Sequence, residues 1–257
     1  MPYNTASDSA WCCTGSGFEN HARYGEGIYA QNAGSLFVNL FIASEVHWRA
    51  RGVTLRQETL FPEATSVRLA VQCEKPADFT LRLRRPDWAK RDVTVRVNDE
   101  AVAASPAADG YIAITRTWKS GDRIALNLPM DLRLEPMPDN SNRVAIVYGP
   151  VVLAGELGTN GIVPPKPYAI KQSDFFKDPQ PAMPVLLAGS RPVAEWIEPV
   201  PGWPLTFRTK GVGQPSDLTL VAFYKLAPQR YSLYWDLFTP AAWEEHRAAA
   251  NKQKKRE

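Results

Sequence analysis

The sequence has few cysteines, no long apolar run and no marked excess of either charge. Three cysteines in 257 residues are too few for a disulfide-based scaffold. No segment approaches the roughly 20 apolar residues that span a bilayer, and the first ten residues lack the basic and apolar regions of a secretory signal. We therefore expect neither a membrane protein nor an evident secretory precursor. A start further upstream would remove the second expectation, so periplasm and cytoplasm both stay open.

The charged residues are balanced and scattered along the chain. Thirty Lys and Arg against 27 Asp and Glu give a formal net charge of +3. No basic stretch stands out as a footprint for nucleic acid or lipid, so we expect neither as a partner. The sequence also contains no glycine-rich phosphate loop, no G-x-S-x-G, no H-E-x-x-H and no internal repeat. The sequence thus lacks the usual signatures of several large enzyme classes.

One short helix is predicted near the start of the chain. Phe18, Ala22 and Tyr24 have helical spacing, and Gly25 and Gly27 are a plausible stop. Beyond this segment the apolar period changes from that of a helix to that of strands.

A period of two begins at Leu36 and predicts a mainly β fold. Seven short alternating runs, separated by turn sequences, indicate an antiparallel β-sandwich. A second β group follows the proline-rich LEPMPDNSN, interrupted by a proline-bearing stretch, 162–204, that we interpret as surface loop. We expect two sandwiches, at 30–136 and 137–238, after a short helical segment at 1–29. A charged helix or tail follows at 239–257.

Adjacent Cys12 and Cys13 are the most unusual local feature. Consecutive Cα atoms lie about 3.8 Å apart, below the usual disulfide range of about 4.4 to 6.8 Å, so a bridge between them would be strained. Thiolates suit zinc, and a cysteine on a metal or at a helix N-terminus can act as a nucleophile. Small buried thiols are an equally open reading. Zinc needs more than two ligands, so the remaining donors would have to lie elsewhere.

Other candidate residues have plainer interpretations. Cys73 continues a core-facing alternation, and His21 is more typical of a surface position than of a metal ligand. Glu19 and Glu26 resemble an acid/base pair in type, but about two helical turns separate them, beyond the retaining distance. Five tryptophans suit either sugar stacking or the core, and we favour the core or domain contacts for most of them: Trp88, Trp118, Trp196, Trp203 and Trp235.

The run WCCTGSGFENHARYGEGIYA, followed by GSLFVNLFIASEVHW and VTLRQETLFP, resembles the β-L-arabinofuranosidases of glycoside hydrolase family 127 and the related family 146. The likeness continues through RPDWA, RTWKSGDRIALNLPM, NRVAIVYGPVVLAGELG, LTFRTKGVGQP and RYSLYW. It covers essentially all of the chain to about Asp236. The pieces are individually short, but their number and order make the resemblance specific.

This resemblance implies a catalytic (α/α)6 toroid followed by two β-sandwich, jelly-roll-like domains, with only the last stretch of the toroid present here. It implies that Cys12 is the nucleophile of a retaining hydrolase and that Cys12 and Cys13 bind Zn²⁺. The family's other zinc ligands, a glutamate and a cysteine, and its acid/base glutamate precede the pair and have no counterpart in this sequence. The expected substrate is an L-arabinofuranoside or a similar plant-type glycan, and the expected partner in cis is the toroid.

Two alternatives stay open at this point. A non-catalytic β-sandwich protein would bind carbohydrate or a partner through exposed tryptophans and would not depend on zinc. Two chains could instead share one structural zinc, each contributing Cys12 and Cys13.

Thr14-Gly15-Ser16-Gly17 replaces the proline-rich sequence that follows the pair in some family members, which leaves the identity of the sugar open.

Overall fold

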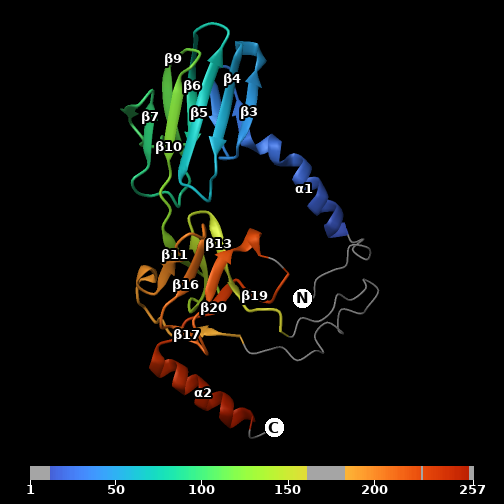
Figure 1. The fold of residues 1–257 in the computed structure, drawn as a ribbon, viewed down its shortest axis with the longest axis vertical. Helices are drawn as coiled ribbons and strands as arrows, with labels where there is room; N and C mark the ends of the chain where they lie inside the picture. The colour runs from blue at the N-terminus through green and yellow to red at the C-terminus, as the bar shows by residue number, and fades with distance from the viewer. Residues whose placement is uncertain (1–11, 161–182, 227, 255–257) are drawn as a thin grey trace. The chain divides into compact units, whose positions relative to one another are not determined.

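The computed structural model describes residues 12–160, 183–226 and 228–254 (Figure 1). Its contacts divide the chain into two compact units with a boundary between Met130 and Asp131. The boundary lies earlier than residue 136, where the sequence analysis placed it, because β11 (Leu132–Pro136) pairs along its whole length with β12 (Arg143–Tyr148). No helix in the described ranges is long and apolar enough to cross a membrane.

Helix α1 (Cys12–Ile28) begins at the cysteine pair and runs through both glycines that were expected to end it. Its end is set by burial at Ile28, which is 7% exposed. The carbonyl oxygen of Ile28 also accepts a hydrogen bond from the Asn39 amide at 2.9 Å, so the last helical turn is tied to the chain after β2. A packed apolar residue therefore fixes this end where local propensity would have stopped the helix earlier.

Two sheets form the first unit. A four-stranded sheet has the order β1-β2-β6-β9, and a six-stranded sheet has the order β3-β4-β5-β10-β7-β8. The strands of the first sheet are β1 (Tyr29–Gln31), β2 (Ser35–Val38), β6 (Ala77–Arg84) and β9 (Tyr111–Trp118). Those of the second are β3 (Ser44–Trp48), β4 (Val53–Thr59), β5 (Ser66–Cys73), β7 (Thr94–Val97), β8 (Glu100–Val102) and β10 (Arg123–Asn127).

Alternation along the strands builds the core of this unit. In β5 the odd-numbered residues Val67, Leu69 and Val71 are at most 1% exposed, while the residues between them face outward. The same alternation in the other strands gives one apolar cluster between the sheets, whose fully buried members include Leu36, Leu55, Leu81, Leu83, Ile112, Trp118, Ile124, Leu126 and Leu128. The predicted mainly β, sandwich-like fold is confirmed.

One strand pairing differs from the antiparallel pattern. β2 runs parallel to β6, whereas every other pairing between named strands is antiparallel. The chain leaves the four-stranded sheet after β2, forms β3, β4 and β5 in the other sheet, and returns as β6 beside β2. An odd number of strands in between brings the chain back in the same direction.

An eight-stranded sheet dominates the second unit. Its main path is β11-β12-β13-β18-β16-β15, with β19 beside β13 and β20 beside β12. Besides β11 and β12, these strands are β13 (Val151–Glu156), β15 (Ile197–Pro199), β16 (Thr206–Thr209), β18 (Thr219–Ala222), β19 (Tyr231–Ser232) and β20 (Tyr234–Asp236). A small sheet pairs β14 (Val185–Leu186) with β17 (Gly213–Gln214).

Two buried tryptophans organise this unit's core. Trp196 is 0% exposed and Trp235 is 1% exposed. A Cβ on Gly155 would lie 2.3 Å from the Trp235 ring, so the indole packs directly on bare backbone. Residues 162–204, which we expected to be surface loop, fall partly outside the described residues. Their described part instead contains β14, β15 and the buried Trp196, because that indole completes the core.

Helix α2 (Pro240–Lys254) closes the described chain. The Thr239 hydroxyl accepts a hydrogen bond from the Ala242 amide at 3.2 Å, and proline occupies the first helical position. Both are favourable at a helix N-terminus, where backbone amides have no helical acceptor. Its described residues are almost all exposed, as their charged and alanine-rich composition leads one to expect.

Candidate active site

Helix α1 carries the cysteine pair and is exposed on every side. From Gly15 to Gly27 each residue is exposed, including Phe18 at 73% and Tyr24 at 51%. In Figure 1 the helix extends away from the sheets of its own unit. An amphipathic helix normally buries one stripe of side chains, so this helix lacks the cover that its apolar residues require.

Cys12 and Cys13 occupy the first two positions of α1, but their side chains lie outside the described residues. Their roles as nucleophile and zinc ligands therefore stay predictions. A position at a helix N-terminus is favourable for a thiolate, because the first backbone amides and the helix dipole stabilise negative charge there.

The acidic residues of α1 are not arranged as an acid/base pair. Arg23 lies between Glu19 and Glu26 and binds both, with nitrogen–oxygen distances of 3.3 and 3.2 Å. Both carboxylates are 68% exposed, so these are solvated ion pairs of little energetic weight. These contacts place Glu26 on the surface, as expected, and Glu19 is equally exposed in the same helix.

Within the described ranges, no group of three or more His, Cys, Asp and Glu side chains could hold a metal ion. His21 is exposed and contacts Tyr24 edge-on, with ring centroids 5.3 Å apart. The helix histidine therefore behaves as a surface residue.

Cys73 differs chemically from the cysteine pair. It is half-buried at the end of β5, packs against the core and directs its Sγ toward the Trp118 carbonyl at 3.9 Å. Burial raises the pKa of the Cys73 thiol, and the nearby negative charge of Asp122 raises it further. A thiol in this environment stays protonated at neutral pH, which makes it a poor nucleophile.

Most tryptophans considered for sugar stacking lie in the cores. Trp118, Trp196 and Trp235 are at most 1% exposed. Trp88 is partly buried and stacks on Phe61 with ring centroids 6.1 Å apart. Trp203, at 70% exposure, is the one member of the five that presents its ring to solvent. The tryptophan platform of a carbohydrate-binding sandwich is therefore reduced to a single residue.

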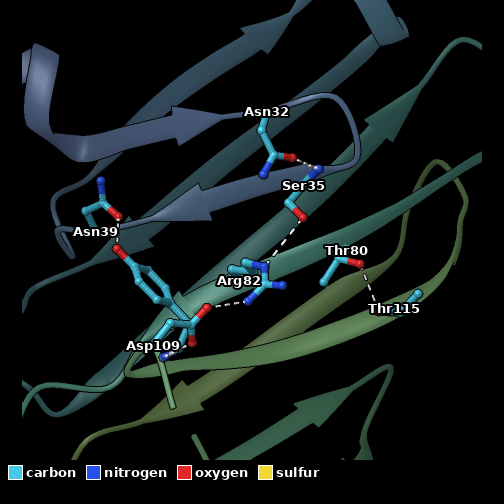
Figure 2. Close-up of polar contacts among 8 residues, drawn as sticks. Asn32, Ser35, Asn39, Thr80, Arg82, Asp109 and Thr115 are labelled. Carbon is cyan, nitrogen blue, oxygen red and sulfur yellow. Dashed lines mark hydrogen bonds and ion pairs between the residues drawn. The ribbon is translucent and has the colours of Figure 1, made fainter. Parts of the chain in front are cut away.

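Polar side chains cover the outer face of the four-stranded sheet (Figure 2). The Arg82 guanidinium binds the Asp109 carboxylate at 2.6 Å and donates from Nε to the Ser35 hydroxyl at 3.4 Å. The guanidinium carbon of Arg82 also lies 5.5 Å from the centre of the Phe37 ring. The charge and the aromatic surface of this network are thus already paired with each other, which leaves little for a ligand to bind.

Asp217 is a structurally important residue that the sequence analysis did not single out. Its carboxylate accepts hydrogen bonds from the amides of Gly211, Val212 and Gly213 at 2.7 to 3.1 Å, and from the Thr209 hydroxyl at 2.9 Å. These donors lower its pKa from 3.8 to about 2, against the opposing effect of burial. A G-x-G sequence that ends four residues before an aspartate is the only local signal for it.

Comparison with known families identifies the first unit. Residues 35–130 match the family model described as β-L-arabinofuranosidase, GH127 middle domain. The predicted resemblance to glycoside hydrolase family 127 is thereby confirmed. Residues 133–237 match a domain family of unknown function, so the two models flank the boundary that the contacts place at Met130. A search of curated proteins found no match.

Solved structures of glycoside hydrolases have a similar fold over most of this chain. Ara127N-Se, a GH127 β-L-arabinofuranosidase from Geobacillus stearothermophilus T6, has a TM-score of 0.62 and 24% identity, over 89% of this chain and 38% of its own. A glycoside hydrolase has a TM-score of 0.62 at 19% identity, over 93% and 42%. A GH127 β-arabinofuranosidase has 0.58 at 22%, over 82% and 36%. The chain spans about two fifths of the length of these structures.

Proposed function

We propose that the chain is the C-terminal part of a retaining, zinc-dependent glycoside hydrolase that acts on L-arabinofuranosides or similar plant-type glycans. The observation that carries the proposal is the GH127 middle domain directly after a helix that begins with adjacent cysteines. The structural similarity to GH127 enzymes supports the shared fold.

In this proposal Cys12 is the nucleophile. Its thiolate attacks the anomeric carbon of the bound sugar while the bond to the leaving oxygen breaks, and a carboxylic acid protonates that oxygen. Water then hydrolyses the thioglycosyl intermediate and restores the thiolate, so the anomeric configuration is retained. No described carboxylate of α1 suits the acid/base role, since Glu19 and Glu26 are both exposed and paired with Arg23.

Cys12 and Cys13 would hold the zinc ion. Two thiolates are soft ligands of the type that zinc prefers, so the pair is chemically suitable as half of a four-ligand site. When bound, zinc keeps a coordinated thiol ionised at neutral pH. In this proposal the other two ligands come from a helical domain.

The proposal also assigns a partner to α1. The exposed Phe18 and Tyr24 would pack against neighbouring helices of a toroidal catalytic domain, and the isolated chain would be inactive. Ile28 and Tyr29 need no such partner, because Ile28 is buried within its own unit and Tyr29 packs against its core, with its hydroxyl 3.0 Å from the Ser44 Oγ.

Hydrolysis of nitrophenyl β-L-arabinofuranoside tests these points. We expect no turnover by this chain alone, and turnover together with bound zinc when the same chain follows a GH127 helical domain. In that longer protein Cys12→Ala should abolish turnover because it removes the nucleophile. Cys73→Ala is the matched control and should retain turnover, because the Cys73 thiol lies within the sandwich.

Three results would contradict the proposal. Robust turnover by the isolated chain would require an acid/base among residues that we consider surface groups. Full activity of the Cys12→Ala variant would show that Cys12 is not the nucleophile. About half a zinc per chain in a dimer of the isolated chain would instead favour a structural site shared between two cysteine pairs.

A further inference from the structure

The outward face of the six-stranded sheet gathers arginines that are dispersed in the sequence. Strict alternation in four neighbouring strands buries the apolar residues and leaves the residues between them exposed. Each of the four strands has one arginine on this outward face: Arg56 in β4, Arg68 in β5, Arg96 in β7 and Arg123 in β10. We call this the arginine face.

The strand register places small residues between these arginines. Ala70 of β5 lies between Arg56 and Arg123 in one row across the sheet. In the next row Ala125 of β10 lies between Arg68 and Arg96. Neighbouring strands are about 4.8 Å apart and residues on one face of a strand about 6.7 Å apart, so the four guanidinium groups surround a floor of two alanines.

Among the described residues, three of these arginines have no carboxylate partner, and two of the three have no partner at all. Arg56 binds Glu58 at 3.0 Å, and the Arg96 guanidinium donates to the Asp99 carbonyl oxygen. For the side chains of Arg68 and Arg123, the described residues provide neither an ion pair nor a hydrogen-bond acceptor. Glu58 stands opposite Arg68 in register but its carboxylate is engaged by Arg56.

The nearby charges leave the face cationic. The other outward carboxylate on this sheet near the arginines is Glu45, which lies opposite Arg56 and binds His47 at 3.2 Å. Glu45 belongs to β3 and Glu58 to β4, and these two strands are neighbours at one edge of the sheet. Arg82 on the other sheet shows the contrast, since its guanidinium is neutralised by Asp109 (Figure 2).

A hollow adjoins the arginine face on the same side of the sheet. Thr54 and Gln72 occupy the next outward row after Arg56 and Ala70, and His47 lies opposite Thr54. With Ser120, Arg49, Glu74 and neighbouring residues they line a depression of about 520 Å³, so the hollow contains one carboxylate and one further guanidinium. Hydroxyl and amide groups in a depression next to cationic side chains provide hydrogen-bonding partners as well as charge.

We propose that the arginine face binds an anionic polysaccharide through the carboxylates of its uronic acid units. Arginine presents a planar fork that pairs with carboxylate through two hydrogen bonds, and the hollow offers donors and acceptors to sugar hydroxyls. The outward residues of the described strands in this sheet include no Phe, Tyr or Trp, whereas surfaces for single-stranded nucleic acid use aromatic rings for base stacking. The choice of a glycan rests on the proposed function.

Binding to immobilised polygalacturonate tests the proposal, with interferometry as the readout and the whole chain as the analyte. The parent protein should bind, and binding should weaken between about 20 and 200 mM salt because the contacts are exposed ion pairs. The variant Arg68→Gln/Arg123→Gln should bind at least about tenfold more weakly, since it removes the two guanidinium groups that have no partner among the described residues. Fully methyl-esterified polymer, which lacks the carboxylates, should not bind.

A matched control removes the same charge elsewhere on the unit. Lys75→Gln/Arg84→Gln changes two exposed cations, one in the turn before β6 and one on the outer face of the other sheet, and should bind like the parent. Thermal unfolding of both double variants checks that each is folded.

Several results would overturn the proposal. Absence of binding at low salt, equal loss in the control variant, or equal binding to the esterified polymer would each do so. Tighter binding of a thymidine oligonucleotide through the same arginines would reassign the face to nucleic acid. Hydrolysis is not the readout, so the two proposals fail separately. If this chain binds polygalacturonate but shows no arabinofuranosidase turnover even when it follows a GH127 helical domain, the proposed function is refuted and this surface is supported.

Discussion

Replacement of Asp217 by asparagine offers a quantitative test of the second unit. The carboxylate collects three backbone amides and one hydroxyl within 3.1 Å, and these contacts lower its pKa from 3.8 to about 2. A shift of this size corresponds to roughly 2 kcal/mol in a shielded site. Because Asp217 is exposed, solvent screening reduces the expected contribution to about 1 kcal/mol.

The sign of the pH dependence follows from the lowered pKa of Asp217. Since the folded pKa lies below the unfolded value, the stabilisation is fully present above about pH 5 and is lost as the pH falls toward 2. Asp217→Asn should therefore lower the free energy of unfolding by about 1 kcal/mol at pH 7 and by much less near pH 2.

Urea unfolding of both proteins across this pH range provides the measurement. Asp139→Asn is the matched control, because Asp139 is an exposed aspartate in the same unit for which no side-chain hydrogen bond is present among the described residues. It should change the free energy of unfolding by less than about 0.5 kcal/mol. An equal loss for Asp217→Asn at pH 7 and pH 2 would refute the electrostatic reasoning, as would an equal loss in the control.

Two further substitutions test the packing and the turns. Gly155→Ala should destabilise the second unit by about 1 to 3 kcal/mol in urea unfolding, because its Cβ would lie 2.3 Å from the Trp235 ring; a neutral effect would contradict that packing. Asp99→Gly should raise the free energy of unfolding slightly, by about 0.5 kcal/mol, because Asn98 and Asp99 form the β7–β8 turn with φ of 50° and 67°. A clear loss of stability there would show that the Asp99 side chain matters more than its backbone strain.

Local patterns predicted the strands well because the side-chain period in a sheet is short. The alternation around Val67, Leu69 and Val71 is legible within one strand, and the structure buries those three residues. The end of α1 could not be read in the same way. Its glycines favour an earlier stop, whereas the burial of Ile28 and its hydrogen bond from Asn39, just after β2, extend the helix further.

Features that join distant segments were not predictable from local patterns. Gly155 and Trp235 are 80 positions apart, and neither residue type alone suggests that an indole lies on a glycine. The arginine face shows an intermediate case. Each arginine is visible as a polar position in an alternating run, but its place beside Ala70 or Ala125 depends on the strand register. The sequence around Cys12 does not indicate which residues would complete a zinc site with it.

The place of Trp235 in its sheet has a consequence for synthesis on the ribosome. β20 pairs with β12, and the Trp235 indole fills the core against Gly155, so the last strand of the second unit completes a sheet begun about 100 residues earlier, at β11. The first unit has all of its strands by Asn127. The first unit can therefore acquire its tertiary structure while the second unit is still a nascent chain, and the second unit must wait for nearly its whole sequence to emerge.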